Sequence, residues 1–314
     1  MAEAVAIIGA GLIGRAWAIV FARGGLPVHL YDPDGQALSA ADSRIGQAIA
    51  DLEDARLIES GAALKELVET RQTLAHALND ALYVQECGPE TPEAKRDIFK
   101  ALDAVAEPSV VLASSSSGIV ASQFTDGLAH PERVLVAHPV NPPYLIPLVE
   151  ICPALASAEW AVKATRELMA RVGQTPITVR KEVQGFALNR LQGALLNEAM
   201  RLYEDGVASA EDLDRTVRDG LGLRWSFMGP FETIDLNAPG GLEDYATRYG
   251  SLFEALGREQ ANPRPWSPET IAALHAERRQ QLAPESLQDR QNWRDRKLMA
   301  LIAHKAATNR DMGE

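Results

Sequence analysis

The chain has 314 residues, of which 46% are hydrophobic and 24% charged, a composition typical of a soluble globular protein with one large or two ordinary domains. Its net charge of −12 argues against nucleic acid or an anionic membrane as a partner, and no apolar run is long enough to span a bilayer. Cys87 and Cys152 lie in or beside apolar runs and are expected to be buried free thiols, and no Cys/His cluster has metal-ligand spacing. The first strand begins by Val5, which leaves no room for a signal peptide, so we expect a cytoplasmic protein.

Residues 5–32 predict a buried strand, a glycine-rich turn, a helix, a second strand and a terminal acid. The turn has the spacing Gly9-x-Gly11-x-x-Gly14, in which the glycines permit a tight turn, a close approach of the backbone to a pyrophosphate, and close packing of the helix on the sheet. Asp32 follows Gly14 by 18 residues, near the roughly 20 expected for the acid that binds a ribose 2′-hydroxyl. A carboxylate there repels the 2′-phosphate of NADP, so the segment predicts a site for NAD.

Alternating strand and helix patterns predict an α/β fold with a Rossmann-type, doubly wound parallel sheet. From Gly185 onward the chain shows helical periodicity and no convincing strand. We therefore place an NAD-binding domain at 1–183 and an all-helical domain for substrate binding and dimerisation at 184–314. The strand-like runs are 4–8, 27–31, 81–86, 109–114, 133–138, 146–152 and 176–180.

Two titratable residues flank a proline-rich loop in the segment 133–153. His138 ends one predicted strand, and Glu150 lies near the end of the next, so two adjacent strands can bring the side chains into contact. A carboxylate on one imidazole nitrogen fixes the tautomer and makes the other nitrogen a better base, which suits removal of a hydroxyl proton during alcohol oxidation. A purely structural hydrogen bond is the alternative role for this histidine.

Ser114–Gly118 follow another predicted strand and place hydroxyl groups where open α/β sheets bind ligands. A solvated serine-rich loop is the alternative interpretation. Asn189 lies where the second domain begins and, taken alone, is equally well explained as a helix cap or a surface residue.

Taken together, six segments of the chain resemble the 3-hydroxyacyl-CoA dehydrogenase family over nearly its whole length. They read GAGLIG, ETPEAK, SSSSGI, HPVNPPYLIPLVE, GFALNR and GPFETIDLNAPGG. The resemblance implies that His138 and Glu150 form the family's catalytic dyad and that Ser117 and Asn189 hold the substrate oxygen. It also implies cofactor contacts from the backbone of Leu12 and Ile13 and from the side chains of Glu90, Lys95 and Asn141.

The sequence departs from the acyl-CoA members of this family in the stretch 33–64. Those members carry lysines after the second strand that help to hold the CoA phosphates, whereas here six acids and two arginines give a net charge of −4 (2 − 6). Such a stretch is a poor place for a polyphosphate and favours a free hydroxy acid. Arg224, beside Trp225, is the candidate partner for its carboxylate, with a surface ion pair as the alternative.

These features predict an NAD-dependent dehydrogenase that oxidises a small L-3-hydroxy acid, such as L-gulonate, to the 3-keto acid as a homodimer. Two other activities stay open, namely a short-chain 3-hydroxyacyl-CoA dehydrogenase and an L-carnitine dehydrogenase. A non-catalytic protein of the crystallin kind, or a nucleotide-sensing module, is the alternative from a different class.

Overall fold

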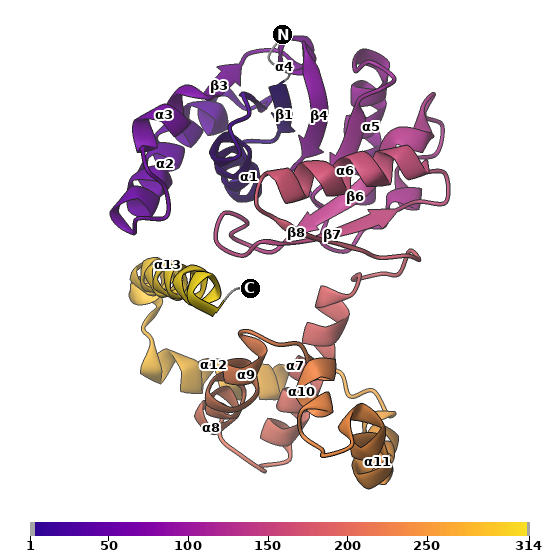
Figure 1. Ribbon diagram of the computed structural model, residues 1–314, viewed down its shortest axis with the longest axis vertical. Coiled ribbons are helices and arrows are strands. Elements are labelled where there is room, and N and C mark those ends of the chain that lie inside the picture. The colour runs from indigo at the N-terminus through magenta and orange to yellow at the C-terminus, as the bar shows by residue number, and fades with distance from the viewer. Residues whose placement is uncertain (1–3, 313–314) are drawn as a thin grey trace. The chain divides into compact units, whose positions relative to one another are not determined.

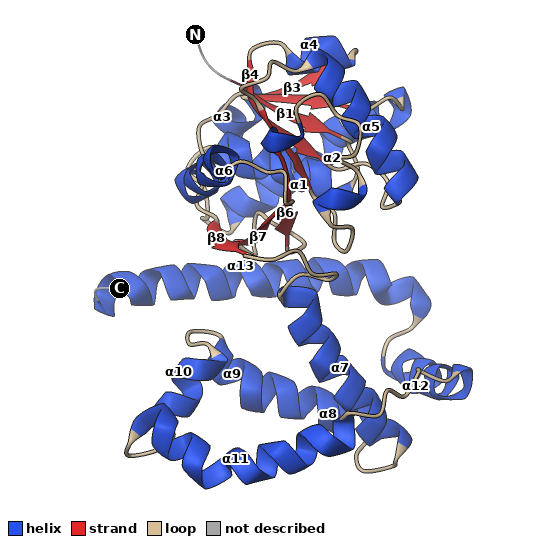
Figure 2. Cartoon of the chain, turned by 90° about the vertical axis from the view of Figure 1, so that its right-hand side faces the viewer, coloured by secondary structure: helices blue, strands red, loops and turns tan. Residues whose placement is uncertain are grey.

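The computed structural model describes residues 4–312, which form two compact units. The first unit contains the described residues up to Arg190 together with those from Gln291 onward, and the second contains Leu191–Arg290. All the strands lie in the first unit, whereas the second consists of helices and loops (Figure 2). The α/β arrangement of the first unit and the helical second unit therefore match the predicted fold class.

The first unit is built on an eight-stranded sheet with the order β3-β2-β1-β4-β5-β6-β7-β8. Neighbouring strands are parallel except for β6 and β7, which pair antiparallel. The central strands are buried along almost their whole length, as expected for a sheet covered on both faces. The strands are β1 (Ala4–Ile8), β2 (Val28–Tyr31), β3 (Val68–Arg71), β4 (Ala81–Glu86), β5 (Val111–Ser114), β6 (Val134–Pro139), β7 (Leu148–Pro153) and β8 (Thr175–Thr178).

Helices cover both faces of this sheet (Figure 1). Because side chains alternate along a strand, Val5 and Ile7 enter one core while Ala6 and Ile8 enter the other. The first core is shared with α1, α2, α6 and α13, and the second with α4 and α5. The helices of this unit are α1 (Leu12–Arg23), α2 (Gly35–Asp54), α3 (Gly61–Glu66), α4 (Leu74–Leu78), α5 (Pro92–Val105), α6 (Glu159–Arg171) and α13 (Leu287–Met312), with short 3₁₀ turns η1 (Ala121–Gln123) and η2 (Pro131–Arg133).

The last helix returns to the first unit. Met299 is buried in the first core, and Leu298 and Ile302 pack against it. The predicted second domain, 184–314, and the compact units therefore differ over α13, because the apolar residues of this helix pack into the core of the first unit.

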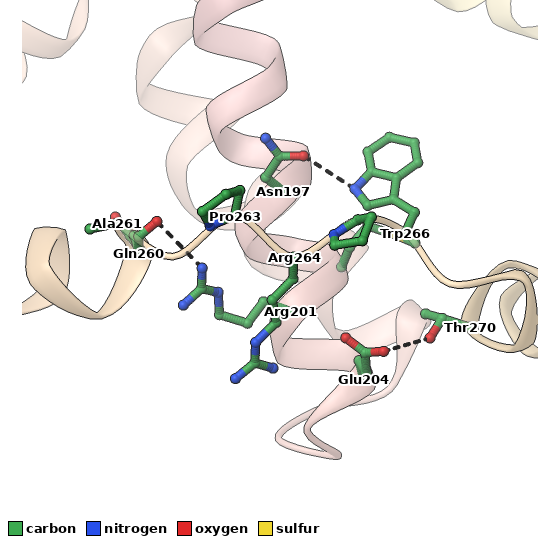
Figure 3. A pocket seen from close by; sticks show the side chains of 11 residues that line it. Asn197, Arg201, Glu204, Gln260, Ala261, Pro263, Arg264, Trp266 and Thr270 are labelled. Atoms are coloured by element: carbon green, nitrogen blue, oxygen red, sulfur yellow. Dashed lines mark hydrogen bonds between the residues drawn. The ribbon is translucent and has the colours of Figure 1, made fainter.

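Helix α7 (Leu188–Glu204) supplies the first residues of the second unit from Leu191 onward, and it ends before Gly206, a glycine with a φ of 69°. Ser209 then caps α8 by accepting a hydrogen bond from the Asp212 backbone N–H, as the sequence predicts. The segment between α11 and α12 runs beside α7, where the Trp266 indole donates to the Asn197 side chain (Figure 3). The remaining elements are α8 (Ala210–Arg215), the π-helical turn η3 (Thr216–Leu221), α9 (Gly222–Trp225), α10 (Pro230–Asp235), α11 (Gly241–Gln260), α12 (Pro268–Gln281) and η4 (Pro284–Ser286).

None of the helices over residues 4–312 combines the length and apolarity needed to cross a membrane. The same residues hold no group of three or more His, Cys, Asp or Glu side chains arranged to bind a metal ion.

Candidate active site

The glycine-rich turn between β1 and α1 has the shape that its spacing predicts. Gly9 has a φ of 112°, and a Cβ atom there would lie 2.6 Å from the Cys87 carbonyl oxygen. A Cβ atom at Gly14 would lie 1.8 Å from the Gly9 carbonyl oxygen, so only glycine allows the helix to approach this closely. At Gly11, by contrast, a Cβ atom would meet nothing within 4 Å. The open space therefore lies beside the second glycine, where a pyrophosphate is expected.

Helix α1 begins at this open space. The backbone N–H groups of Leu12 and Ile13 belong to its first turn and have no partner within the helix. Unpaired N–H groups at a helix N-terminus favour an anion, so the turn fits the phosphates of a dinucleotide.

Asp32 is held at the end of β2 by the backbone around it. One carboxylate oxygen accepts the Ala10 N–H at 2.7 Å, and the other accepts the Asp34 N–H at 2.9 Å. A cavity of about 660 Å³ borders Gly9, Gly11 and Asp32 and continues between apolar side chains. The residues present therefore fit the adenosine half of NAD.

His138 and Glu150 face each other across the antiparallel pair β6–β7. The His138 Nδ1 atom lies 2.9 Å from Glu150 Oε2, and the two side chains are 6% and 0% exposed. An ionised carboxylate only accepts hydrogen bonds, so Nδ1 carries the proton and Nε2 is left with its lone pair. The geometry thus gives the tautomer that a base acting through Nε2 requires.

The second oxygen of Glu150 is fixed by the segment that leads into α7. Glu150 Oε1 accepts the N–H groups of Ala187 and Leu188, each at 2.9 Å. Gly185 and Phe186 precede them with φ values of 78° and 51°, and this left-handed bend turns the two N–H groups toward the carboxylate. Burial raises the pKa of Glu150, but the hydrogen bonds from His138, Leu188 and Ala187 outweigh it, so the pKa lies below its ordinary value.

The serine-rich loop after β5 is organised by Glu90. Its Oε1 atom accepts the Ser116 hydroxyl at 2.7 Å, the Ser117 N–H at 2.8 Å and the Gly118 N–H at 3.2 Å. Asn189 adds a hydrogen bond from its side-chain amide to the Ser117 carbonyl oxygen at 2.6 Å. Ser117 and Asn189, which the sequence predicts in one site, are therefore in direct contact, and the Ser117 side chain lies exposed at the end of the loop.

Lys95 lies beneath this loop in a buried ion pair that the sequence analysis missed. Its ammonium group is 1% exposed and donates to both carboxylate oxygens of Glu86, each at 2.9 Å. The Ser114 hydroxyl donates to Glu86 at 2.7 Å, and Glu90 lies 3.7 Å from the ammonium nitrogen. The signal that could have revealed Glu86 is an acid at the end of an apolar strand, because acids are almost never fully buried without a partner. The contact of Lys95 with the cofactor stays a prediction.

A second hydrogen-bond network holds Ser115, in the same loop. Its hydroxyl accepts the Trp17 indole N–H at 3.1 Å and the Gln85 amide at 2.7 Å, and it lies 3.2 Å from the Cys87 sulfur. Burial raises the pKa of the Cys87 thiol to about 12, so this sulfur stays protonated. Cys87 and Cys152 are both free, as expected.

Two further predicted residues are exposed. Asn141 lies on the loop between β6 and β7. Arg224 lies on α9 in the second unit, and no ion pair found among the described residues includes its guanidinium group. The contact of Arg224 with a substrate carboxylate stays a prediction.

Comparison with known proteins decides the family. Residues 4–183 match the family described as 3-hydroxyacyl-CoA dehydrogenase, NAD binding domain, and residues 185–283 match its C-terminal domain. The chain belongs to the 3-hydroxyacyl-CoA dehydrogenase family. It is accordingly an NAD-dependent dehydrogenase of this family, which confirms the predicted cofactor and class of enzyme.

Individual relatives cover almost the full length. The chain is 40% identical to a lambda-crystallin homolog of Rattus norvegicus over 96% of its own length and 95% of the relative's. It is 35% identical to an L-carnitine dehydrogenase of a Pseudomonas species, over 95% of this chain and 92% of the other. Among solved structures, the NAD-dependent 5-formyl-3-hydroxy-2-methylpyridine 4-carboxylic acid 5-dehydrogenase is 30% identical and similar with a TM-score of 0.83, covering 96% and 97% of the two chains.

Proposed function

We propose that the protein oxidises a small free L-3-hydroxy acid, of the L-gulonate kind, to the corresponding 3-keto acid. The observation that carries this proposal is the His138–Glu150 pair, in which a buried carboxylate holds the imidazole with Nε2 free. Bound NAD supplies the acceptor for the hydride that leaves the hydroxyl-bearing carbon. The residues of the chain must then remove the hydroxyl proton and hold the oxygen on which charge develops.

His138 performs the first task as a general base. Nε2 takes the hydroxyl proton, and Glu150 stabilises the resulting imidazolium because its carboxylate already lies 2.9 Å from Nδ1. The hydrogen bonds from Ala187 and Leu188 keep Glu150 ionised and oriented throughout. General-base catalysis of this kind contributes about 10²–10⁴-fold to the rate.

Ser117 and Asn189 perform the second task. Glu90 fixes the backbone on either side of Ser117, so its hydroxyl is presented by a loop with little freedom. Asn189 donates one amide hydrogen to the Ser117 carbonyl and keeps a second for the substrate oxygen.

Replacement of His138 by Gln tests the proposed base. We expect turnover to be abolished while NADH binding, measured by fluorescence titration, stays within about twofold of wild type. A His138→Gln enzyme with normal kcat would refute the assignment. Absence of any turnover by the wild type with every hydroxy acid offered would instead favour the non-catalytic alternative.

The preference for a free acid over a CoA thioester is supported by charge. Helix α2 and the loop after it carry the acidic excess noted in the sequence, and Lys65, just beyond that stretch, is already paired with Asp42. A polyphosphate would therefore meet an acidic surface there with few free cations. Two relatives also act, by their names, on molecules without CoA, namely L-carnitine and a pyridine carboxylic acid.

A homodimer is supported by the surface of the second unit. No described residue of α7, α11 or α12 is buried. Large apolar side chains of this unit are exposed to solvent, including Phe231 on α10 at 75% and Phe253 on α11 at 53%. Exposed apolar patches of this kind mark protein interfaces, and the second copy of this chain is the proposed partner. Light scattering at micromolar concentration tests this, and a monomeric mass would contradict it.

A further inference from the structure

The cavity beside Asp32 contains a second carboxylate that neither the motif nor the proposed chemistry explains. Asp97, on α5, lines this cavity with Ile98 and Ala101 from the same helix. Its side chain is exposed, and its carboxylate makes no hydrogen bond or ion pair with any residue that the structure describes. A charged group without a partner, on the wall of a mostly apolar ligand cavity, is placed to meet a polar group of the ligand.

The arrangement of the cavity indicates which part of the dinucleotide Asp97 meets. Gly11 marks the pyrophosphate end and Asp32 marks the ribose, so the base lies beyond Asp32. The rest of the lining includes the apolar side chains of Leu74, Ile98 and Ala101, which suit the flat faces of a purine. Asp97 precedes Ile98 on α5 and is the other acid in the lining besides Asp32, which the N–H groups of Ala10 and Asp34 already hold.

We propose that Asp97 determines the specificity for adenine by accepting a hydrogen bond from the exocyclic amino group of the base. An ionised carboxylate can only accept hydrogen bonds, and the adenine amino group can only donate them. In hypoxanthine a carbonyl oxygen replaces the amino group and would face the carboxylate without a hydrogen between them. Asp97 therefore favours adenine and disfavours hypoxanthine at the same position.

The test compares the reduced cofactor NADH with its hypoxanthine analogue, measured as dissociation constants by fluorescence titration and as KM in steady-state kinetics. We expect wild type to bind NADH about tenfold more tightly than the analogue, a difference in the range of one hydrogen bond to a charged group. Asp97→Ala should weaken NADH binding and bring the two dissociation constants within about twofold, with kcat unchanged. Asp97→Asn should also reduce the discrimination but keep NADH affinity, because an amide can either donate or accept.

Glu93→Ala is the matched control, since Glu93 is an exposed acid on the same helix that does not line the cavity. It should leave both dissociation constants unchanged. The proposal is overturned if Asp97→Ala retains the wild-type preference for NADH. It is equally overturned if that variant gains NADPH binding while its ratio for the two bases is unchanged, because Asp97 would then act on the ribose and not on the base.

Discussion

Glu150→Gln is the substitution that most sharply tests how the site is held. The carboxylate of Glu150 uses its two oxygens to accept from three N–H donors, those of His138, Ala187 and Leu188. Glutamine has a single acceptor oxygen, so it cannot accept both from His138 and from the N–H groups of Ala187 and Leu188. If its oxygen faces the backbone, its amide N–H₂ faces His138 Nδ1.

That orientation reverses the histidine tautomer. Nδ1 must then accept, the proton moves to Nε2, and Nε2 can no longer take a proton from the substrate. The opposite orientation would leave the N–H groups of Ala187 and Leu188 facing an amide nitrogen, and each buried unsatisfied donor costs about 1–3 kcal/mol. We therefore expect kcat to fall by about 10²–10⁴-fold, less than for His138→Gln, and the free energy of unfolding to fall by about 1–3 kcal/mol.

The assay is NADH formation under saturating substrate, with NADH affinity and denaturant unfolding measured on the same protein. Glu182→Gln is the control, because Glu182 also accepts a backbone N–H, from Ser122 at 2.9 Å, whereas the hydrogen bond to His138 Nδ1 comes from Glu150. A folded Glu150→Gln enzyme whose kcat lies within fivefold of wild type would refute the account of the tautomer.

The same substitution should change the pH dependence of stability. The folded-state pKa of Glu150 lies below its ordinary value of 4.5, so its ionised form stabilises the fold above that pH. This contribution is lost as the pH falls through the folded pKa. Wild type should therefore lose more unfolding free energy between neutral pH and acid than Glu150→Gln, and equal losses would contradict the stabilising role of the carboxylate.

The remaining predictions concern the cofactor, the buried ion pair and the substrate. Asp32 should make kcat/KM at least about tenfold higher with NAD than with NADP, since a like-charge clash costs more than about 1.4 kcal/mol, and equal values would refute this. Lys95→Met should lower the free energy of unfolding by about 3–5 kcal/mol because it leaves Glu86 buried and unpaired, whereas lost NADH affinity at unchanged stability would instead favour a cofactor contact. Arg224→Lys should raise KM for the hydroxy acid more than KM for NAD, and Arg224→Met more strongly still, because bidentate pairing with a carboxylate is lost. Unchanged acid kinetics in Arg224→Met would remove that residue from the substrate site.

The sheet was largely predictable because its central strands are short apolar runs. The exception is β3, whose sequence Val68-Glu-Thr-Arg71 contains two charged residues and forms an edge of the sheet with exposed side chains. An edge strand pairs on one side only, so hydrophobicity does not reveal it. The hydrophobic pattern also did not predict that β7 pairs antiparallel to β6, because buried parallel and buried antiparallel strands have similar apolar sequences.

The site was predictable where a residue type implies a chemistry, as for His138, Glu150 and the glycine-rich turn. The backbone conformations and contacts that hold those residues in place could not be predicted from the sequence. The turn of Phe186 into the left-handed region is unusual for a non-glycine residue, and only the fold reveals that it directs Ala187 and Leu188 toward Glu150. The contact of Glu90 with the serine loop likewise depends on two segments that lie 26 residues apart in the chain.

The central claim is oxidation of a free L-3-hydroxy acid by NAD, and a substrate panel tests it most directly. L-gulonate, L-3-hydroxybutyrate and L-carnitine would be offered with NAD, and acetoacetyl-CoA with NADH, while NADH absorbance is followed. The account predicts the highest kcat/KM for one of the free acids, with L-gulonate as the expected substrate. A kcat/KM for acetoacetyl-CoA far above that of every free acid would contradict it and assign the protein to the acyl-CoA branch of its family.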